Sequence, residues 1–318
     1  MTPGAGPGSR YPPAPMALQE PGYPGAVPPE RTRDVASMGI RLRLHEWGDP
    51  EAPPLLLTHG MFDHARGFDT LAPLLATRFR VVSLDARGHG DSGWADAYTW
   101  VTDLADLANV LRSLGRPAHL LGHSKGGGQA TDTACHHPEL VRQLVNIDGF
   151  GPSPEGFRPP GMELDVRSIP ERFASFLDRR GAEEERAWRP YASLEELVAR
   201  RRRMNPRLSP EWLRHFLFHG SREVEGGFVW KVDPLAAGGF GPFKPEWIAP
   251  FWRRLRAPML AVIGSERDTW GPLPEALLQE RLAYVPHVER ATVQGAGHFV
   301  HMERPRETAE LLLAWLER

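Results

Sequence analysis

The sequence predicts a doubly wound α/β fold, and its apolar patterning supports this. Short, nearly continuous apolar runs occur at Leu55–Leu57, Val81–Leu84, His119–Leu121, Leu144–Ile147 and Met259–Ile263. Such runs are typical of parallel strands that are covered on both faces. The segments between them have helical length and apolar spacing near three and four, as at Leu104, Leu107, Leu111 and Leu114. Alternating strands and helices predict a mostly parallel sheet with helices on both faces.

The beginning of the chain differs from this core. Residues 1–34 are rich in proline and glycine and lack periodicity, so we expect a disordered tail without a secretory signal. The segment from Met38 to Trp47 alternates apolar and polar side chains, which predicts a half-buried antiparallel strand near a sheet edge. We therefore place the core domain at residues 35–151 and 252–318, ending in a helix that carries Leu311, Leu312, Trp315 and Leu316.

Residues 152–251 interrupt the alternation, because no strand-like run of comparable strength occurs there. Helical spacing at 170–180, 193–204 and 210–218 predicts a mostly helical cap. Ser193 followed by Glu196 indicates a capping box, and Pro210 suits a first helical turn. We interpret Arg200–Arg203 as a solvated helix face rather than a nucleic-acid contact.

The composition describes a soluble globular protein. With 25% charged residues and a net charge of −2, the 318-residue chain lacks the positive field that recruits nucleic acid. No run of about 18 apolar residues is present to span a membrane. Cys135 is the only cysteine, so an intrachain disulfide is excluded and a cytoplasmic location is the simplest expectation. The histidine pairs lack the partners of a zinc site, and we expect no metal.

One motif points to chemistry. The sequence Gly122-His123-Ser124-Lys125-Gly126 lies between an apolar run and a stretch of small residues that can open a helix. A sharp turn from strand to helix would expose the Ser124 hydroxyl, and the flanking glycines leave room for the turn. We predict that Ser124 is a nucleophile.

Other strand ends carry groups that acyl transfer requires. After Thr58, the turn at His59-Gly60 would aim the Met61 N–H at an oxyanion, together with the Lys125 N–H at the helix start. His298, on a glycine-flanked loop, is the predicted general base. Asp268 is the favoured acid that orients the imidazole, with Asp148 as the alternative.

These motifs together resemble the α/β-hydrolase fold family: His59-Gly60, Asp85-x-Arg87-Gly88-x-Gly90-x-Ser92, the turn at Ser124, then Asp268 and Gly297-His298. The resemblance implies an eight-stranded sheet, a cap inserted after the sixth strand, and a hydrolase that needs no metal or organic cofactor. It also implies that His59 braces the oxyanion turn and that His123 packs within the turn at Ser124. Dehalogenases and epoxide hydrolases of this fold use an aspartate nucleophile, so serine at position 124 disfavours them.

Several residues have a structural interpretation. We expect the Lys125 side chain to turn toward solvent, although a cation there could instead depress the pKa of His298 or attract an acidic substrate. Arg87 and Asp91 are expected to stabilise the loop after the fourth strand. Candidate lining residues of an apolar substrate pocket are Phe62, Trp94, Phe150, Trp270 and Phe299.

The sequence thus predicts a serine hydrolase that cleaves a carboxylic ester or related acyl bond of a small, partly apolar substrate. Carbon–carbon bond hydrolysis, acyl transfer or perhydrolysis on the same triad stay open as alternatives. A non-catalytic member of the fold is disfavoured, since every triad member is present. Substrate identity and oligomeric state stay open.

Overall fold

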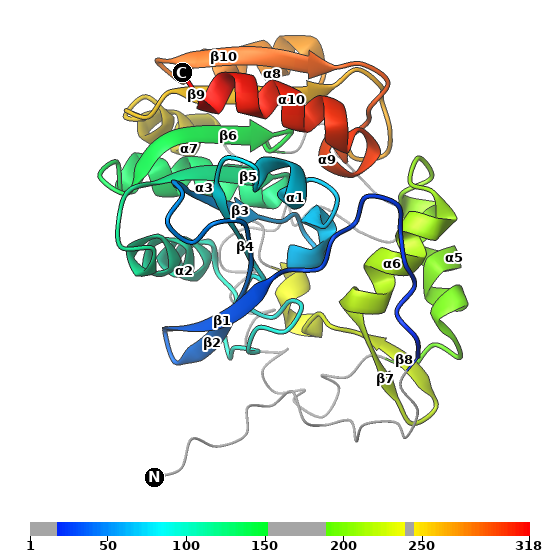
Figure 1. The fold of residues 1–318 in the computed structure, drawn as a ribbon. Helices are drawn as coiled ribbons and strands as arrows, with labels where there is room; N and C mark the ends of the chain where they lie inside the picture. The colour runs from blue at the N-terminus through cyan, green and yellow to red at the C-terminus, as the bar shows by residue number, and fades with distance from the viewer. Residues whose placement is uncertain (1–17, 152–188, 239–244) are drawn as a thin grey trace.

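The fold is seen in a computed structural model that describes residues 18–151, 189–238 and 245–318. Its central sheet has eight strands in the order β1 (Arg31–Ser37), β2 (Ile40–Trp47), β4 (Arg80–Leu84), β3 (Pro54–Thr58), β5 (Ala118–His123), β6 (Val141–Ile147), β9 (Met259–Gly264) and β10 (Val288–Val293) (Figure 1). β2 pairs antiparallel with β1 and β4, and the remaining pairs are parallel. This confirms the predicted fold class and every predicted core strand.

Helices cover both faces of the sheet. Successive side chains of each strand point to opposite faces, so each strand contributes to both layers. Leu55 and Leu57 of β3 belong to one buried cluster and Leu56 to the other. One layer contains η2 (Ala65–Phe68), α1 (Ala72–Leu75), α9 (Val300–Glu303) and α10 (Pro305–Leu316); the other contains α2 (Trp100–Ser113), α3 (Lys125–His136), α7 (Pro245–Trp252) and α8 (Glu275–Leu282). The central strands are therefore mostly apolar, as parallel strands between two helical layers require.

Asp132 joins three helices of the second layer. This carboxylate on α3 accepts a hydrogen bond from Trp100 Nε1 of α2 at 2.7 Å and from Trp252 Nε1 of α7 at 2.8 Å. Burial raises the pKa of Asp132, although the two indole donors act to lower it. α3, the helix that follows Ser124, is thereby fixed to both α2 and α7.

The predicted boundary of the N-terminal tail is wrong. Residues 1–17 lie outside the described part of the chain, but residues 18–30 run along α6 (Pro210–Gly220) toward β1 (Figure 1). Tyr23 packs edge-on against Trp212 at 5.0 Å between ring centroids, and Val27 N–H donates to Asp69 O at 3.0 Å. These contacts are tertiary, so local composition gave no signal of them.

The inserted region contains α5 (Leu194–Met204), α6, a hairpin of β7 (Ser221–Val224) and β8 (Gly227–Trp230), and η4 (Pro234–Gly238). The prediction of a mostly helical cap did not include the hairpin, whose turn uses positive φ at Gly226 and Gly227. Ser193 Oγ caps α5 by accepting from Glu196 N–H at 3.2 Å, and Pro210 opens α6 as predicted. The predicted helix at 170–180 lies outside the described residues.

α5 and α6 lie on the side of the sheet toward which β6 and β10 point (Figure 1). Their apolar residues form a third cluster that includes Phe299 and Met302 from the chain after β10. The insertion thus packs beside the carboxyl ends of the parallel strands, where ligand sites of open α/β sheets occur.

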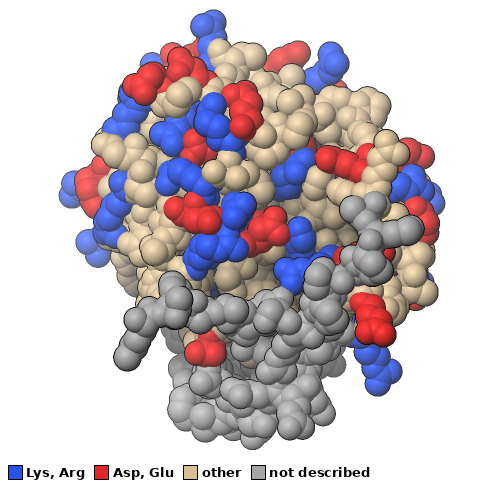
Figure 2. All heavy atoms as spheres, turned by 60° about the horizontal axis from the view of Figure 1, so that its bottom comes forward, with Lys and Arg blue, Asp and Glu red and all other residues tan. Residues whose placement is uncertain are grey.

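The surface carries both signs of charge. Figure 2 shows basic and acidic side chains interspersed over the described part of one face, without a continuous basic area there. Within the described residues, no helix is long and apolar enough to cross a membrane.

Truncating a side chain in the second layer should destabilise the fold far more than truncating one on the surface of the same helix. Leu107 of α2 is 2% exposed, whereas Val101 of α2 is 73% exposed. We expect Leu107→Ala to lower the free energy of unfolding by about 3 kcal/mol, since it leaves a cavity. Val101→Ala should change it by less than about 0.5 kcal/mol. Urea unfolding of both variants measures the difference, and equal losses would contradict the assigned burial.

Candidate active site

Ser124 lies at the sharp turn between β5 and α3. Its backbone has φ 54° and ψ −121°, a strained conformation for a residue with a side chain. The preceding strand is buried along its whole length, while Ser124 itself is partly exposed. The turn therefore lifts this hydroxyl-bearing residue out of the core, as the motif predicts.

Glycines make this turn possible. A Cβ at Gly122 would lie 2.2 Å from the carbonyl oxygen of Gly126, and one at Gly126 would lie 2.5 Å from that of His59. A Cβ at Gly60 would lie 3.2 Å from Ser124 Cβ. The turn at Ser124 and the turn after β3 are thus packed backbone against backbone, which only glycine allows.

Asn146, which is fully buried in β6, fastens the same region from the other side. Its Nδ2 donates to Gly127 O at 3.2 Å and to Gly149 O at 3.3 Å, while its Oδ1 accepts from Gly149 N–H at 2.8 Å. One side chain therefore holds the first turn of α3 against the turn that carries Asp148.

The structure places Asp148, and not Asp268, against the imidazole of His298. His298 Nδ1 lies 2.6 Å from Asp148 Oδ2, and both side chains are about 5% exposed or less. Asp268 Oδ2 instead accepts from the backbone N–H of His298 at 2.8 Å. The favoured assignment of Asp268 as the orienting acid is thus corrected in favour of the alternative.

The physical reason is the arrangement of the two strand ends. Asp148 follows β6 and Asp268 follows its neighbour β9, so both carboxylates reach the same edge of the sheet. Asp268 Oδ1 accepts from the N–H groups of Trp270 and Gly271, so its oxygens are occupied by backbone donors. Asp148 has φ 46°, a left-handed conformation that aims its carboxylate at the ring.

The charge state of His298 follows from its neighbours. Burial acts to lower its pKa, but the hydrogen bond and the charge of Asp148 outweigh burial and raise the pKa above its usual value. Since Nδ1 faces a carboxylate, the neutral ring keeps its proton there and leaves Nε2 as the lone-pair nitrogen. Trp270 stacks on the ring with centroids 6.4 Å apart.

The turn after β3 is braced by His59. Its Nδ1 donates to Gly60 O at 2.7 Å, and its Nε2 accepts from Ala86 N–H at 3.0 Å. Burial lowers the pKa of His59, in agreement with a neutral ring that both donates and accepts. Within the described part of the chain, neither the Met61 N–H nor the Lys125 N–H donates a hydrogen bond, so both amides are available to a ligand.

The Lys125 side chain does not turn toward solvent as expected. It is 10% exposed, and its Nζ lies 3.0 Å from Asp103 Oδ2 on α2. Gln129 Nε2 donates to the same oxygen at 2.6 Å. The lysine charge is therefore offset inside the protein, which removes the reason to regard it as an attractor of acidic substrates.

Arg201 was not predicted as a site residue. The side chain is 5% exposed rather than solvated, and its guanidinium reaches from α5 to Asp63 Oδ1 and toward Phe62 O at 3.4 Å. Burial acts to raise the pKa of Asp63, but Arg201 and His123 hold it far below its usual value. The insertion is thus ion-paired to the turn that carries Met61. A run of four arginines gave no indication of which one is buried.

His123 connects this ion pair to His298. Its Nε2 donates to His298 O at 3.1 Å, and its Nδ1 lies 3.7 Å from Asp63 Oδ2. Burial outweighs the neighbouring Asp63 carboxylate and lowers the pKa of His123. Three loops, those after β3, β5 and β10, are thereby joined beneath Ser124.

The loop after β4 is stabilised as expected. Arg87 makes a bidentate pair with Asp106 of α2, at 2.7 and 2.8 Å. Asp85 accepts from Ala65 N–H at 2.7 Å and from Asp91 N–H at 2.9 Å. A Cβ at Gly90 would lie 2.2 Å from Asp85 Cγ, which explains the glycine in this motif.

The aromatic candidates have different surroundings. Phe150 is 1% exposed and packs edge-on with Trp252 in the core. Phe299 is buried with the insertion's apolar cluster. Phe62, Trp94 and Trp270 are half-buried, and Trp270 and Phe62 directly border His298 and Met61.

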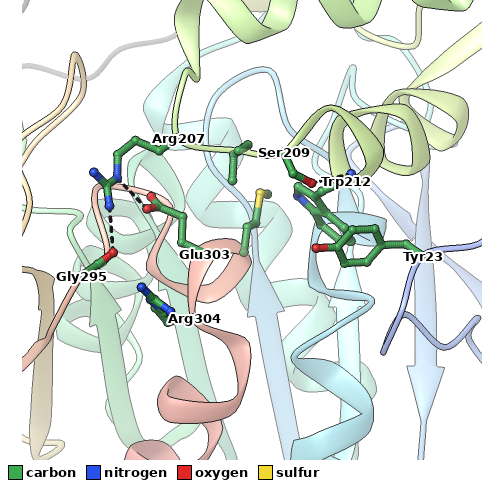
Figure 3. Close-up of a pocket in the computed structure, with 9 residues that line it drawn as sticks. Tyr23, Arg207, Ser209, Trp212, Gly295, Glu303 and Arg304 are labelled. Carbon is green, nitrogen blue, oxygen red and sulfur yellow. Dashed lines mark hydrogen bonds and ion pairs between the residues drawn. The ribbon is translucent and has the colours of Figure 1, made fainter.

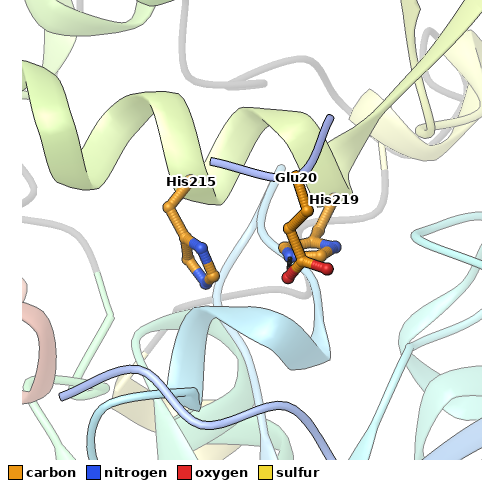
Figure 4. Close-up of side chains that lie close together, drawn as sticks. All are labelled: Glu20, His215 and His219. Atoms are coloured by element: carbon orange, nitrogen blue, oxygen red, sulfur yellow. Dashed lines mark hydrogen bonds and ion pairs between the residues drawn. The ribbon is translucent and has the colours of Figure 1, made fainter. Parts of the chain in front are cut away.

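Two groups of described side chains have metal-ligand composition: His45 with Asp85 and Asp91, and Glu20 with His215 and His219. Glu20, His215 and His219 offer ligand atoms within 4.8 Å of one another, the two histidines lying on one face of α6 (Figure 4). Arg66 lies 3.5 Å from Glu20 and donates to His219 Nδ1 at 3.2 Å, so a positive charge is already supplied there. We interpret the second group as a network that fastens the N-terminal segment, and the absence of a metal stays a prediction.

Removing Arg201 should leave a buried carboxylate without its main partner. We expect Arg201→Gln to lower the free energy of unfolding at neutral pH by about 3–5 kcal/mol. The penalty should shrink in acid, because the unpaired Asp63 takes up a proton there. Arg202→Gln, an exposed neighbour on α5, should cost less than about 0.5 kcal/mol. Urea unfolding at two pH values tests this; equal costs for the two variants would refute the ion pair's importance.

Comparison with known proteins identifies similar hydrolases. The sequence is 38% identical over 284 residues to an sn-1-specific diacylglycerol lipase of Xenopus tropicalis, covering 85% of this chain and 80% of that protein. It is 30% identical over 287 residues to a 3-hydroxybutyrate-oligomer hydrolase of Cupriavidus necator, covering 85% and 90%. A thioesterase domain from the curacin biosynthetic pathway has the same fold, with a TM-score of 0.75, 23% identity and coverage of 89% and 98%.

The family model of the alpha/beta hydrolase family matches residues 55–311. This span includes the turn at Ser124, both carboxylates and His298, and the named relatives are hydrolases. The chain therefore belongs to the alpha/beta hydrolase family and is a hydrolase.

Proposed function

We propose that this hydrolase cleaves carboxylic esters of small, partly apolar substrates through Ser124, His298 and Asp148. The observation that carries the proposal is the buried 2.6 Å contact between His298 Nδ1 and Asp148, on a loop that His123 links to the strained turn at Ser124. A serine, an imidazole and a carboxylate that act in this order form the constellation used in acyl transfer.

The reaction follows from the hydrogen-bonding roles. His298 Nε2 removes the proton of Ser124 Oγ as this oxygen attacks the ester carbonyl. The N–H groups of Met61 and Lys125 hold the resulting oxyanion. Asp148 keeps the imidazole in the tautomer with a free Nε2 and stabilises the cation. His298 then protonates the leaving alcohol, and water attacks the acyl-enzyme by the same route.

Ester cleavage is favoured over the other reactions of this triad by two features. The diacylglycerol lipase and the oligomer hydrolase are relatives that match most of this chain. The half-buried rings of Trp270 and Phe62 supply apolar surface beside the proposed base and oxyanion turn. We therefore assign a substrate with an apolar acyl group.

The nucleophile can be tested directly. Ser124→Ala should lower kcat for p-nitrophenyl butyrate by about three orders of magnitude or more, since no other hydroxyl replaces the attacking group. A fluorophosphonate probe should label the wild-type protein at Ser124 and leave the variant unlabelled. Hydrolysis and labelling that persist in Ser124→Ala would refute the assignment, and absence of both in folded wild-type protein would refute ester hydrolysis.

The two carboxylates can be separated by matched amides. Asp148→Asn keeps a residue that adopts φ 46° readily but presents a donor to Nδ1, so kcat should fall by about 10³- to 10⁴-fold. Asp268→Asn should lower kcat much less, because the hydrogen bond that Asp268 makes with His298 is to the backbone N–H and not to the imidazole. The reverse order of effects in initial-rate measurements would reinstate Asp268 as the acid.

The pH profile should report the same assignment. Only the neutral imidazole accepts the proton of Ser124, so kcat/KM should decrease as the pH falls through the raised pKa of His298. Asp148 raises this pKa, and its removal in Asp148→Asn should move the acidic limb to lower pH. Asp268→Asn should move it less, since Asp268 contributes less to the shift. An unmoved limb in Asp148→Asn would argue against the contact.

A further inference from the structure

A cavity lies beside the loop that leads to His298. It has a volume of about 280 Å³ and is lined in part by Tyr23, Arg207, Ser209, Trp212, Glu303 and Arg304. Figure 3 shows Tyr23 and Trp212 on one side and Arg207, Glu303 and Arg304 on the other. Ser124, His298 and Asp148 do not line it, so it is distinct from the proposed catalytic site.

Trp212 presents an unused donor to this cavity. The residue is 2% exposed, and its Nε1 has no hydrogen-bond partner among the described residues. The indole is held between Tyr23, with centroids 5.0 Å apart, and His215, at 5.4 Å. A buried N–H without an acceptor is destabilising, and a ligand oxygen that accepts from it would remove this penalty.

The opposite side supplies positive charge. Arg304 is about half exposed. Its Nη1 lies 3.9 Å from Oε1 of Glu307. Its Nη2 would lie 2.9 Å from a Cβ at Gly295, which places the guanidinium against the cavity wall. Glu303 is also on this wall: its Oε2 accepts from Arg207 at 2.7 Å and from Gly297 N–H at 3.0 Å, whereas its Oε1 has no partner among the described residues. Because Arg207 is paired with Glu303, the positive charge offered to a ligand on this side is that of Arg304.

Apolar surface connects the two ends, because Leu208 and Met302 also line the cavity. A ligand that fits these surroundings has a carboxylate for Arg304, a short aliphatic body, and a second oxygen that accepts from Trp212. The volume lies at the lower end of the range for small-molecule pockets, which limits the ligand to a short chain.

We propose that this cavity binds a short-chain carboxylate with a hydroxyl or keto oxygen at its far end. Because the test is a binding measurement, it stands or falls separately from the assigned ester hydrolysis. The ligand would lie against the clamp in which Arg207 holds Gly295 O at 2.8 Å and Glu303 holds the Gly297 N–H. It would therefore contact the segment that precedes His298.

Nuclear magnetic resonance of ¹⁵N-indole-labelled full-length protein tests the proposal, with 5-hydroxypentanoate as the probe. The indole resonance missing from Trp212→Phe identifies Trp212. We expect this resonance to move saturably with 5-hydroxypentanoate. Pentanoate, which lacks the far oxygen, should bind about tenfold more weakly, the loss of roughly one hydrogen bond. 1,5-Pentanediol, which lacks the carboxylate, should bind at least tenfold more weakly.

Arg304→Gln should weaken 5-hydroxypentanoate binding at least tenfold, and Arg306→Gln, an exposed arginine two residues away, should leave it unchanged. Circular dichroism confirms that both variants are folded. An unmoved or unsaturable Trp212 resonance would overturn the proposal. Equal effects of Arg304→Gln and Arg306→Gln, or equal binding of the diol, would overturn the assigned carboxylate contact.

Discussion

The candidate site depends on one buried amide. Asn146 binds the first turn of α3 and the turn at Gly149 at once, and it leaves no room for a Cβ on either side. Because Ser124 and Asp148 lie directly before these two glycine-containing turns, their positions are set by backbone packing and not by flexible side chains. The strained conformations of both residues are maintained by this packing.

The buried charges of the same region are held in ion pairs. Asp63 is held ionised by Arg201 from the insertion, and Lys125 is offset by Asp103 from α2. Each pair joins a segment of the site to a different helix, α5 in one case and α2 in the other. The main effect of the pairs is therefore to hold these segments in position. Breaking either pair would leave one buried charge, which is much costlier than never having formed the pair.

The loop before His298 is the place where the different parts of the molecule meet. Arg207 and Glu303 clamp its backbone, while the neighbouring cavity is closed on its other side by Tyr23 from the N-terminal segment and Trp212 from α6. The segment first interpreted as a tail therefore helps to form a wall beside the proposed general base. Such an arrangement allows a ligand outside the catalytic site to contact the loop that positions the imidazole.

The sequence by itself determined the six strands β2, β3, β4, β5, β6 and β9, the turn at Ser124 and the turn after β3, because these depend on local apolar runs and glycine spacing. Only the tertiary structure decided between Asp148 and Asp268, since two adjacent parallel strands deliver both carboxylates to one edge and side-chain direction depends on the neighbours. The sequence also did not predict the burial of Arg201 and Lys125 or the packing of residues 18–30. Each depends on a partner elsewhere in the chain, and the local residue pattern does not identify such partners.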